Sequence, residues 1–147
     1  MIDRSCIGRT LPPHTADVEP GRLRFFAKAV GETRPEYVDE EAARAAGHPA
    51  LLALPTYALC LDLDVPDAFA WLRDLGVLLP RVLHGAQSFR YFAPIHAGDR
   101  LMFAARIEDV YEKRGGALTF IVKETDVTNQ DGVKVAEMRA TIVVRGG

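Results

Sequence analysis

The residues with the clearest capacity for chemistry lie in the loop 31–39, which follows a helical pattern and starts at a glycine. The Glu32 carboxylate can act as a general base, whereas Tyr37 is better suited to donating a hydrogen bond, because a phenol gives up its proton far less readily than a carboxylic acid. Arg34 can pair with Glu32 or bind a ligand phosphate. We therefore predict an acid–base or binding site here. The alternative is a solvated loop of paired charges, which is common at protein surfaces.

Two histidines are further candidates for a site. His84 precedes Gly85 on a predicted strand, and a glycine within a strand often marks a close approach by a ligand or another backbone. We predict that His84 lies in a pocket or at a subunit interface, with Gly85 beside the substrate; the alternative is a hydrogen-bonded structural histidine. His48 is predicted to line a substrate channel. We expect His96 to be solvated in a turn and assign no site role to it or to His14.

The first half of the chain must position these residues, and its pattern predicts helices. Apolar residues recur at helical spacing over 23–30, and Gly31 is placed to end that helix in a left-handed conformation. Asp39 is predicted to cap a short helix that follows it, because its carboxylate can accept from the first free N–H groups. The segment 56–61 is apolar on nearly every side, which is typical of a helix buried all round. A shorter amphipathic helix or turn is predicted over 66–75.

The second half reads as strands, because apolar and polar residues alternate from residue 82 onward. Glycine-containing connections at 114–116 and 129–132 are hairpin signals, so we predict an antiparallel meander. Its four strands are predicted at 82–92, 100–113, 117–128 and 133–144. The sheet needs an apolar element against its inner face, and the segment 56–61 is available for that place. The pattern thus predicts an α+β fold, a curved antiparallel sheet around one central apolar helix.

Length and composition exclude several classes. A chain of 147 residues is about the size of one domain, so we predict a single domain over 1–147. A net charge of -2 gives no electrostatic reason to bind nucleic acid. The longest apolar run, 51–63, is broken by Pro55 and Asp62, so we predict a cytoplasmic protein without a membrane span. Cys6 and Cys60 lack metal-ligand spacing, and we predict neither a metal site nor a cofactor.

Two stretches resemble a known family. The loop is similar to the signature Gly-Asp-x-Asn-Pro-[Leu/Ile]-His-x-Asp of the MaoC-like enoyl-CoA hydratases. Gly31, Pro35 and Asp39 match it, whereas Glu32, Arg34 and Tyr37 stand at its Asp, Asn and His. The second stretch, LHGAQSFRYFAPIHAGDRL at 83–101, resembles the FAS1-like dehydratase, or MaoC N-terminal, branch, as do 47–49 and 54–57. The resemblance covers nearly the whole chain and implies the hot-dog fold.

The resemblance also implies a reaction, the addition of water to a 2-enoyl thioester or the reverse loss of water from a 3-hydroxyacyl thioester. In the family, Asp and His share the proton transfers, and N–H groups at the start of the central helix polarise the thioester carbonyl. Carried over to this chain, those N–H groups are the ones near Thr56 and Tyr57. The predicted catalytic residues are Glu32, Tyr37 and His84. The predicted substrate-binding residues are Arg34, His48, Thr56, Tyr57 and Gly85.

Two functions from different classes remain open. The chain is either a hydratase or dehydratase acting on acyl-CoA or acyl-ACP with an altered motif, or a non-catalytic acyl-binding subunit. In the second case it pairs with another hot-dog chain that carries the intact Asp and His. An exposed strand edge is a liability, so either function predicts a homodimer or a heterodimer. A hot-dog thioesterase is a third possibility, without a motif in its favour.

Overall fold

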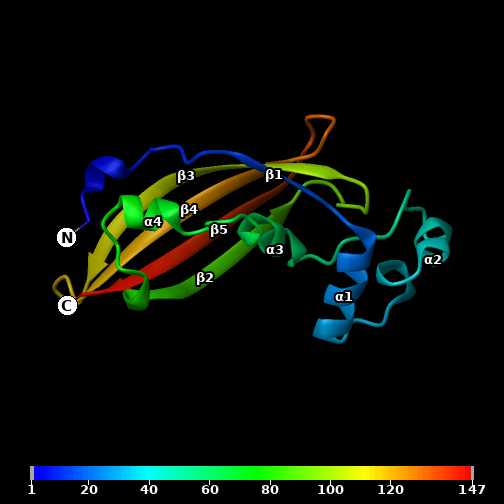
Figure 1. The fold of residues 1–147 in the computed structure, drawn as a ribbon, viewed down its shortest axis with the longest axis horizontal. Helices are drawn as coiled ribbons and strands as arrows, with labels where there is room; N and C mark the ends of the chain where they lie inside the picture. Colours follow the sequence, from blue (N-terminus) through cyan, green and yellow to red (C-terminus); the bar gives the residue numbers. More distant parts are fainter. Residues whose placement is uncertain (1, 147) are drawn as a thin grey trace.

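The computed structural model describes residues 2–146 as a curved antiparallel sheet with helices over one face and beyond one end (Figure 1). The strands are β1 (His14–Asp17), β2 (Val82–Tyr91), β3 (Arg100–Lys113), β4 (Leu118–Thr128) and β5 (Lys134–Arg145). The helices are α1 (Pro20–Val30), α2 (Glu40–Ala45), α3 (Tyr57–Leu63) and α4 (Ala70–Asp74). Short 3-10 turns lie at Arg4–Cys6, Pro35–Tyr37 and Leu79–Arg81.

The strand order is β1-β3-β4-β5-β2, and every pairing is antiparallel. The successive strands β3, β4 and β5 form the predicted hairpins. The prediction of one meander through all four long strands is wrong, because β2 pairs with β5, with Phe89 opposite Met138. The connection 92–99 contains Pro94 and is too long for a tight hairpin, so it carries the chain to the far side of the sheet. The short β1, which pairs with β3, was not predicted.

Local signals set the ends of the first two helices as predicted. Gly31 follows α1 with a φ of 75°, and its N–H donates to the carbonyls of Ala27 and Lys28. The Asp39 carboxylate accepts from the Ala42 N–H at 2.7 Å and so caps α2. These two caps fix the start and the end of the loop 31–39.

Two clusters of buried side chains lie between the helices and the sheet. In the first, α3 packs Tyr57, Ala58 and Leu61 against the sheet, and the contact includes Phe103 and Met138. In the second, α4 places Leu72 against the other half of the sheet. The segment 56–61 is less enclosed than predicted, since Thr56 is exposed and Leu59 and Cys60 are half-buried. The face of α3 that the sheet covers carries Tyr57, Ala58 and Leu61.

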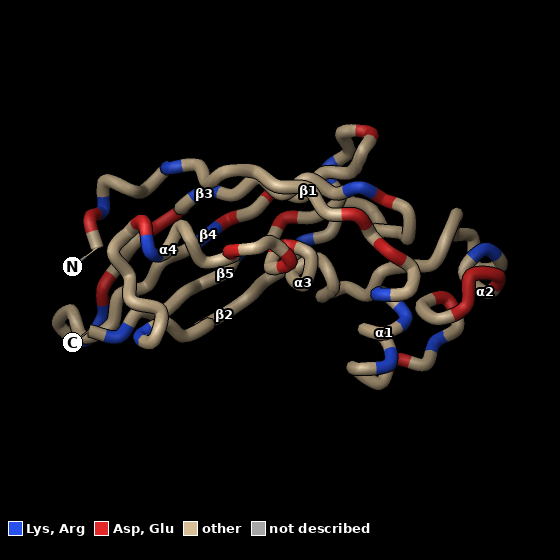
Figure 2. Tube along the Cα trace, in the orientation of Figure 1, with Lys and Arg blue, Asp and Glu red and all other residues tan. Residues whose placement is uncertain are grey.

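Acidic and basic residues are interspersed along the chain, with acidic residues at the start of α2 and basic ones along α1 (Figure 2). Within residues 2–146, none of the helices has both the length and the apolar character needed to span a membrane. The same residues hold no group of three or more His, Cys, Asp or Glu side chains placed to bind a metal ion.

Candidate functional site

The loop 31–39 brings Glu32, Arg34 and Tyr37 together as one contact network. The Glu32 carboxylate accepts from the N–H groups of Thr33 and Arg34, each at 2.9 Å, and from the Arg34 Nη2 at 2.8 Å. The Arg34 guanidinium also lies over the Tyr37 ring, 4.8 Å from its centroid. The three predicted residues are therefore neighbours, with Arg34 between the other two.

These contacts change the chemistry available to Glu32. The side-chain and backbone hydrogen bonds from Arg34 stabilise the carboxylate and hold the pKa of Glu32 at about 2. At pH 7 only about one such group in 10⁵ is protonated, and a carboxylate of this pKa is a weak base at neutral pH. The Glu32 side chain is 18% exposed, and it does not line the cavity described next.

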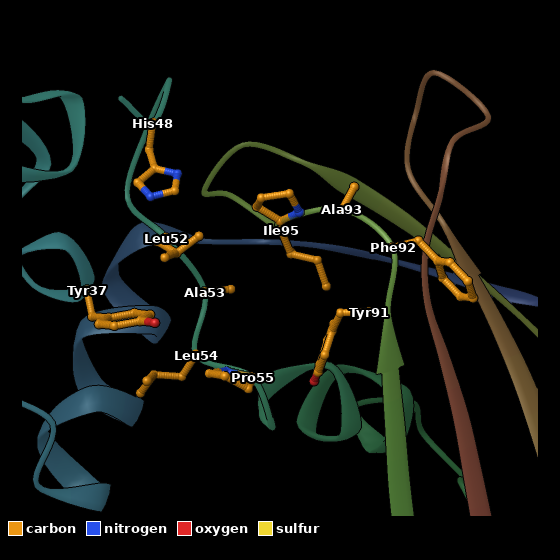
Figure 3. A pocket seen from close by; sticks show the side chains of 11 residues that line it. Tyr37, His48, Leu52, Ala53, Leu54, Pro55, Tyr91, Phe92, Ala93 and Ile95 are labelled. Atoms are coloured by element: carbon orange, nitrogen blue, oxygen red, sulfur yellow. The ribbon is translucent and has the colours of Figure 1, made fainter. Parts of the chain in front are cut away.

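A cavity of about 430 Å³ lies between this loop and the end of β2 (Figure 3). Most of its lining is apolar and comes from two extended segments that run beside each other. The backbone N–H of Ala53 donates to Ile95, and that of Ala97 donates to Leu51, which ties the segments together. The lining residues are Tyr37, His48, Leu52, Ala53, Leu54, Pro55, Tyr91, Phe92, Ala93, Pro94 and Ile95.

Two phenols enter this cavity from opposite sides. Tyr37 comes from the 3-10 turn, with its ring buried and its hydroxyl directed towards Ala53 and Leu54 (Figure 3). Tyr91 comes from the end of β2 and points towards Pro55 (Figure 3). Burial raises the pKa of Tyr91 to about 12, so it is a neutral hydrogen-bonding group at physiological pH. Tyr91 was not predicted as a site residue.

His48 lines the cavity and is paired with a second histidine, and its predicted place along a substrate channel stays a prediction. The His48 Nδ1 lies 3.1 Å from the His96 Nε2, so one ring donates to the other. Burial lowers the pKa of His96, Asp99 opposes this shift, and His48 adds to it. The expectation that His96 is solvated is wrong, because an isolated bridge between Leu52 and His96 holds it half-buried beside His48.

The start of α3 adjoins the cavity through Pro55. Thr56 is the exposed residue before the helix, and the Tyr57 N–H donates to the Leu54 carbonyl at 3.0 Å, so that donor is engaged within the chain. The Tyr57 ring packs against Phe26, with 5.2 Å between the ring centroids. Burial raises the pKa of Tyr57. The roles predicted for Thr56 and Tyr57 in substrate binding remain predictions.

His84 and Gly85 lie on β2, outside the lining of this cavity. His84 is exposed and lines a separate small cavity together with Asp62 and Lys123. Gly85 sits at a register shift between β2 and β5, where an added Cβ would lie 2.7 Å from the Val143 Cγ2. The close approach at Gly85 is therefore to β5, and its predicted contact with substrate is untested, as is the catalytic role of His84.

Of the eleven residues that line the cavity, the sequence predicted only Tyr37 and His48. Residues 91–95 belong to the stretch 83–101, which resembles the FAS1-like dehydratase branch, yet nothing in that stretch identifies Tyr91 or Ile95 as cavity residues. The one available signal was the position of Tyr91 at the end of an alternating strand, three residues before Pro94. The pairing of 51–53 with 95–97 depends on contacts distant in sequence, and no local pattern encodes it.

Similar known proteins identify the family to which this chain belongs. Residues 5–138 match the family model described as "FAS1-like, dehydratase domain region". A "UPF0336 protein" of Saccharopolyspora erythraea is 37% identical over 146 residues, covering 99% of this chain and 92% of that protein.

The solved structures that are similar to this chain include two complexes of Mycobacterium tuberculosis. A chain of the C-terminally truncated HadBC (3R-hydroxyacyl-ACP dehydratase) complex of Mycobacterium tuberculosis has a TM-score of 0.78 and 29% identity, covering 94% of this chain and 96% of that one. A chain of the ChsH1–ChsH2 complex of the same organism has a TM-score of 0.75 and 23% identity, covering 93% and 89%. The second likeness concerns the fold alone. The curved sheet around α3 is the hot-dog fold, and the chain belongs to the FAS1-like dehydratase family of MaoC-like proteins.

Proposed function

We propose that this chain is the acyl-thioester-binding subunit of a two-chain hot-dog dehydratase, in which a second chain carries the intact Asp and His. The observation that carries the proposal is the state of Glu32. Its carboxylate is occupied by Arg34 and two backbone N–H groups, with a pKa of about 2, at the position where the family signature has its catalytic Asp. A carboxylate held in this way orders the loop and is a weak base at neutral pH.

The cavity between the loop 31–39 and β2 supports the proposed binding of an acyl thioester. Its volume of about 430 Å³ lies in the usual range of ligand sites, roughly 300–1,000 Å³, and such sites are mostly apolar with a few polar groups. Here the polar groups are Tyr37, His48 and Tyr91. An acyl chain fits the apolar walls, and the Tyr37 hydroxyl can donate to a thioester oxygen.

The proposed pairing with a second hot-dog chain is supported by an open strand edge and by a similar protein complex. The strand β2 ends the sheet, and one of its edges carries no strand among the described residues. Exposed apolar side chains lie near this edge: Leu83 is on β2 itself, and Leu63 and Phe69 line a cavity together with His84 of the same strand. Such an edge favours strand addition by another chain. HadBC, whose chain is 29% identical to this one, is a complex that acts as a 3R-hydroxyacyl-ACP dehydratase.

The test compares the chain alone with the chain co-purified with a hot-dog protein that has the intact signature. Loss of the conjugated thioester absorbance of a 2-enoyl-CoA reports turnover. We expect no turnover by the chain alone, turnover by the pair, and less than a twofold change in the pair with Glu32→Gln. The Asp→Asn change in the partner's signature is expected to abolish turnover. Glu41→Gln, at an exposed acid on α2, is the matched control.

The second candidate is an enzyme that acts without a partner, with an altered acid–base set. It is favoured by the position of Tyr37 and His48 in one cavity. Turnover by the chain alone that is lost on Glu32→Gln, Tyr37→Phe or His84→Gln would establish this candidate and overturn the first.

A further inference from the structure

A second cavity, of about 60 Å³, lies between α3, α4 and the strands β2, β4 and β5. Two polar atoms at this cavity are buried and have no hydrogen-bond partner among residues 2–146. They are the Thr125 Oγ1 and the Gln87 Oε1. Thr125 is only 1% exposed. Buried polar atoms are almost always paired in folded proteins, so two unpaired ones at the same cavity indicate a group that the protein itself does not supply.

The same cavity contains an ion pair. The Lys123 Nζ donates to the Asp62 Oδ2 at 2.7 Å, and the two side chains are 13% and 3% exposed. The lining thus offers an ammonium donor, acceptors on Asp62 and Gln87, and a Thr125 hydroxyl that can do both. A hydroxyl group both donates and accepts, so it can satisfy this set. An alkyl group would leave Thr125 and Gln87 unpaired.

One row of side chains on β2 runs from this cavity to the first one. Side chains on a strand alternate between faces, so Gln87, Phe89 and Tyr91 share a face. Gln87 and Phe89 are half-buried, whereas Ser88 and Arg90 are exposed. Tyr91 lines the first cavity and Gln87 the second, and Phe89 stacks on Tyr91 with 6.0 Å between ring centroids. Gln87 and Tyr91 are four residues apart on the strand, which corresponds to about 13 Å.

We propose that the second cavity is a subsite for a hydroxyl group carried on the acyl chain of the ligand. The inference rests on the proposed function, because it needs the acyl thioester to enter the first cavity. The chain then follows the row from Tyr91 past Phe89, and its hydroxyl meets Thr125 and Gln87. An extended acyl chain advances about 1.2 Å per bond, so the distance from Tyr91 to the subsite corresponds to roughly eleven bonds of the acyl chain. Water can occupy the subsite in the free protein, and the ligand hydroxyl reproduces its hydrogen bonds.

Isothermal titration tests this with two matched ligand pairs. Dodecanoyl-CoA is compared with ω-hydroxydodecanoyl-CoA, and octanoyl-CoA is compared with ω-hydroxyoctanoyl-CoA. The hydroxyl of the shorter ligand is too close to its thioester to reach the second cavity. We expect the wild-type chain to bind the longer hydroxylated ligand about tenfold more tightly than its parent, and the shorter pair about equally. Thr125→Val keeps the shape of the side chain and removes its oxygen. In this variant the tenfold preference is expected to vanish while the melting temperature stays at or above that of the wild type.

The outcomes separate this inference from the function on which it rests. Equal affinity for the two longer ligands in the wild type, or a preference retained in Thr125→Val, overturns the hydroxyl subsite and leaves acyl binding intact. Absence of binding by any of the four ligands overturns the proposed function as well. A crystal structure with ω-hydroxydodecanoyl-CoA is expected to place its hydroxyl within hydrogen-bond distance of the Thr125 Oγ1. Ordered water there, with the hydroxyl elsewhere, contradicts the inference.

Discussion

The register shift at Gly85 gives a prediction that separates packing from substrate contact. A Cβ at this position would lie 2.7 Å from the Val143 Cγ2 and 3.1 Å from the Thr141 carbonyl oxygen. Val143 is 9% exposed on β5, so it has little room to move. Overpacking of this kind costs about 1–3 kcal/mol. A domain of this size loses about 2–4 °C of melting temperature per kcal/mol, so Gly85→Ala is expected to lower it by roughly 2–12 °C.

A double-mutant cycle with Val143→Ala tests the cause. Val143→Ala removes the atom at 2.7 Å, so Gly85→Ala is expected to cost at least about 1 kcal/mol less in that background. The contact with the Thr141 carbonyl remains, and the rescue is therefore partial. Urea unfolding of the four proteins gives the coupling energy, with Ser88→Ala on the same strand as the control. An equal cost in both backgrounds refutes the packing account. Weaker acyl-CoA binding without any loss of stability would instead support the predicted substrate contact of Gly85.

Two further predictions concern stability. Because burial lowers the pKa of His96, the unfolded chain binds a proton more readily than the native chain just below the ordinary value of 6.5. The free energy of unfolding should therefore fall as the pH drops through that window, and His96→Gln should flatten this part of the profile in urea unfolding between about pH 8 and pH 5. Leu61→Ala, at a fully buried position in α3, should cost about 2–5 kcal/mol, whereas Leu63→Ala, at an exposed position in the same helix, should cost less than about 1 kcal/mol in thermal unfolding.

The parts of the fold that depend on local chemistry were predictable from the sequence. Gly31 ends α1 because a left-handed residue suits glycine, and Asp39 begins α2 because its carboxylate pairs with a free N–H. The glycine-containing turns fixed the hairpins from β3 to β5 in the same way. The fold family followed from the residues of the loop 31–39 and of the stretch 83–101.

The remaining features depend on residues far apart in the chain. The pairing of β2 with β5 is set by packing across the sheet, and no turn between them records it. The contact between His48 and His96 likewise needs the bridge at Leu52, which only the folded chain creates. The sequence left open whether Glu32 is a base or part of a charged pair. Its contacts with Arg34 could be resolved only from the geometry of the loop.

The proposed function depends most on binding of the acyl group in the first cavity. Ala53 lies in its wall between the two phenols, so Ala53→Phe should fill the space without changing the charged loop (Figure 3). Titration of the purified chain with dodecanoyl-CoA is the most direct measurement, with Ala104→Phe, at an exposed position on β3, as the control. We predict saturable binding by the wild type and the control, and at least a tenfold loss of affinity in Ala53→Phe with an unchanged melting temperature. Equal affinity in all three proteins would contradict the account.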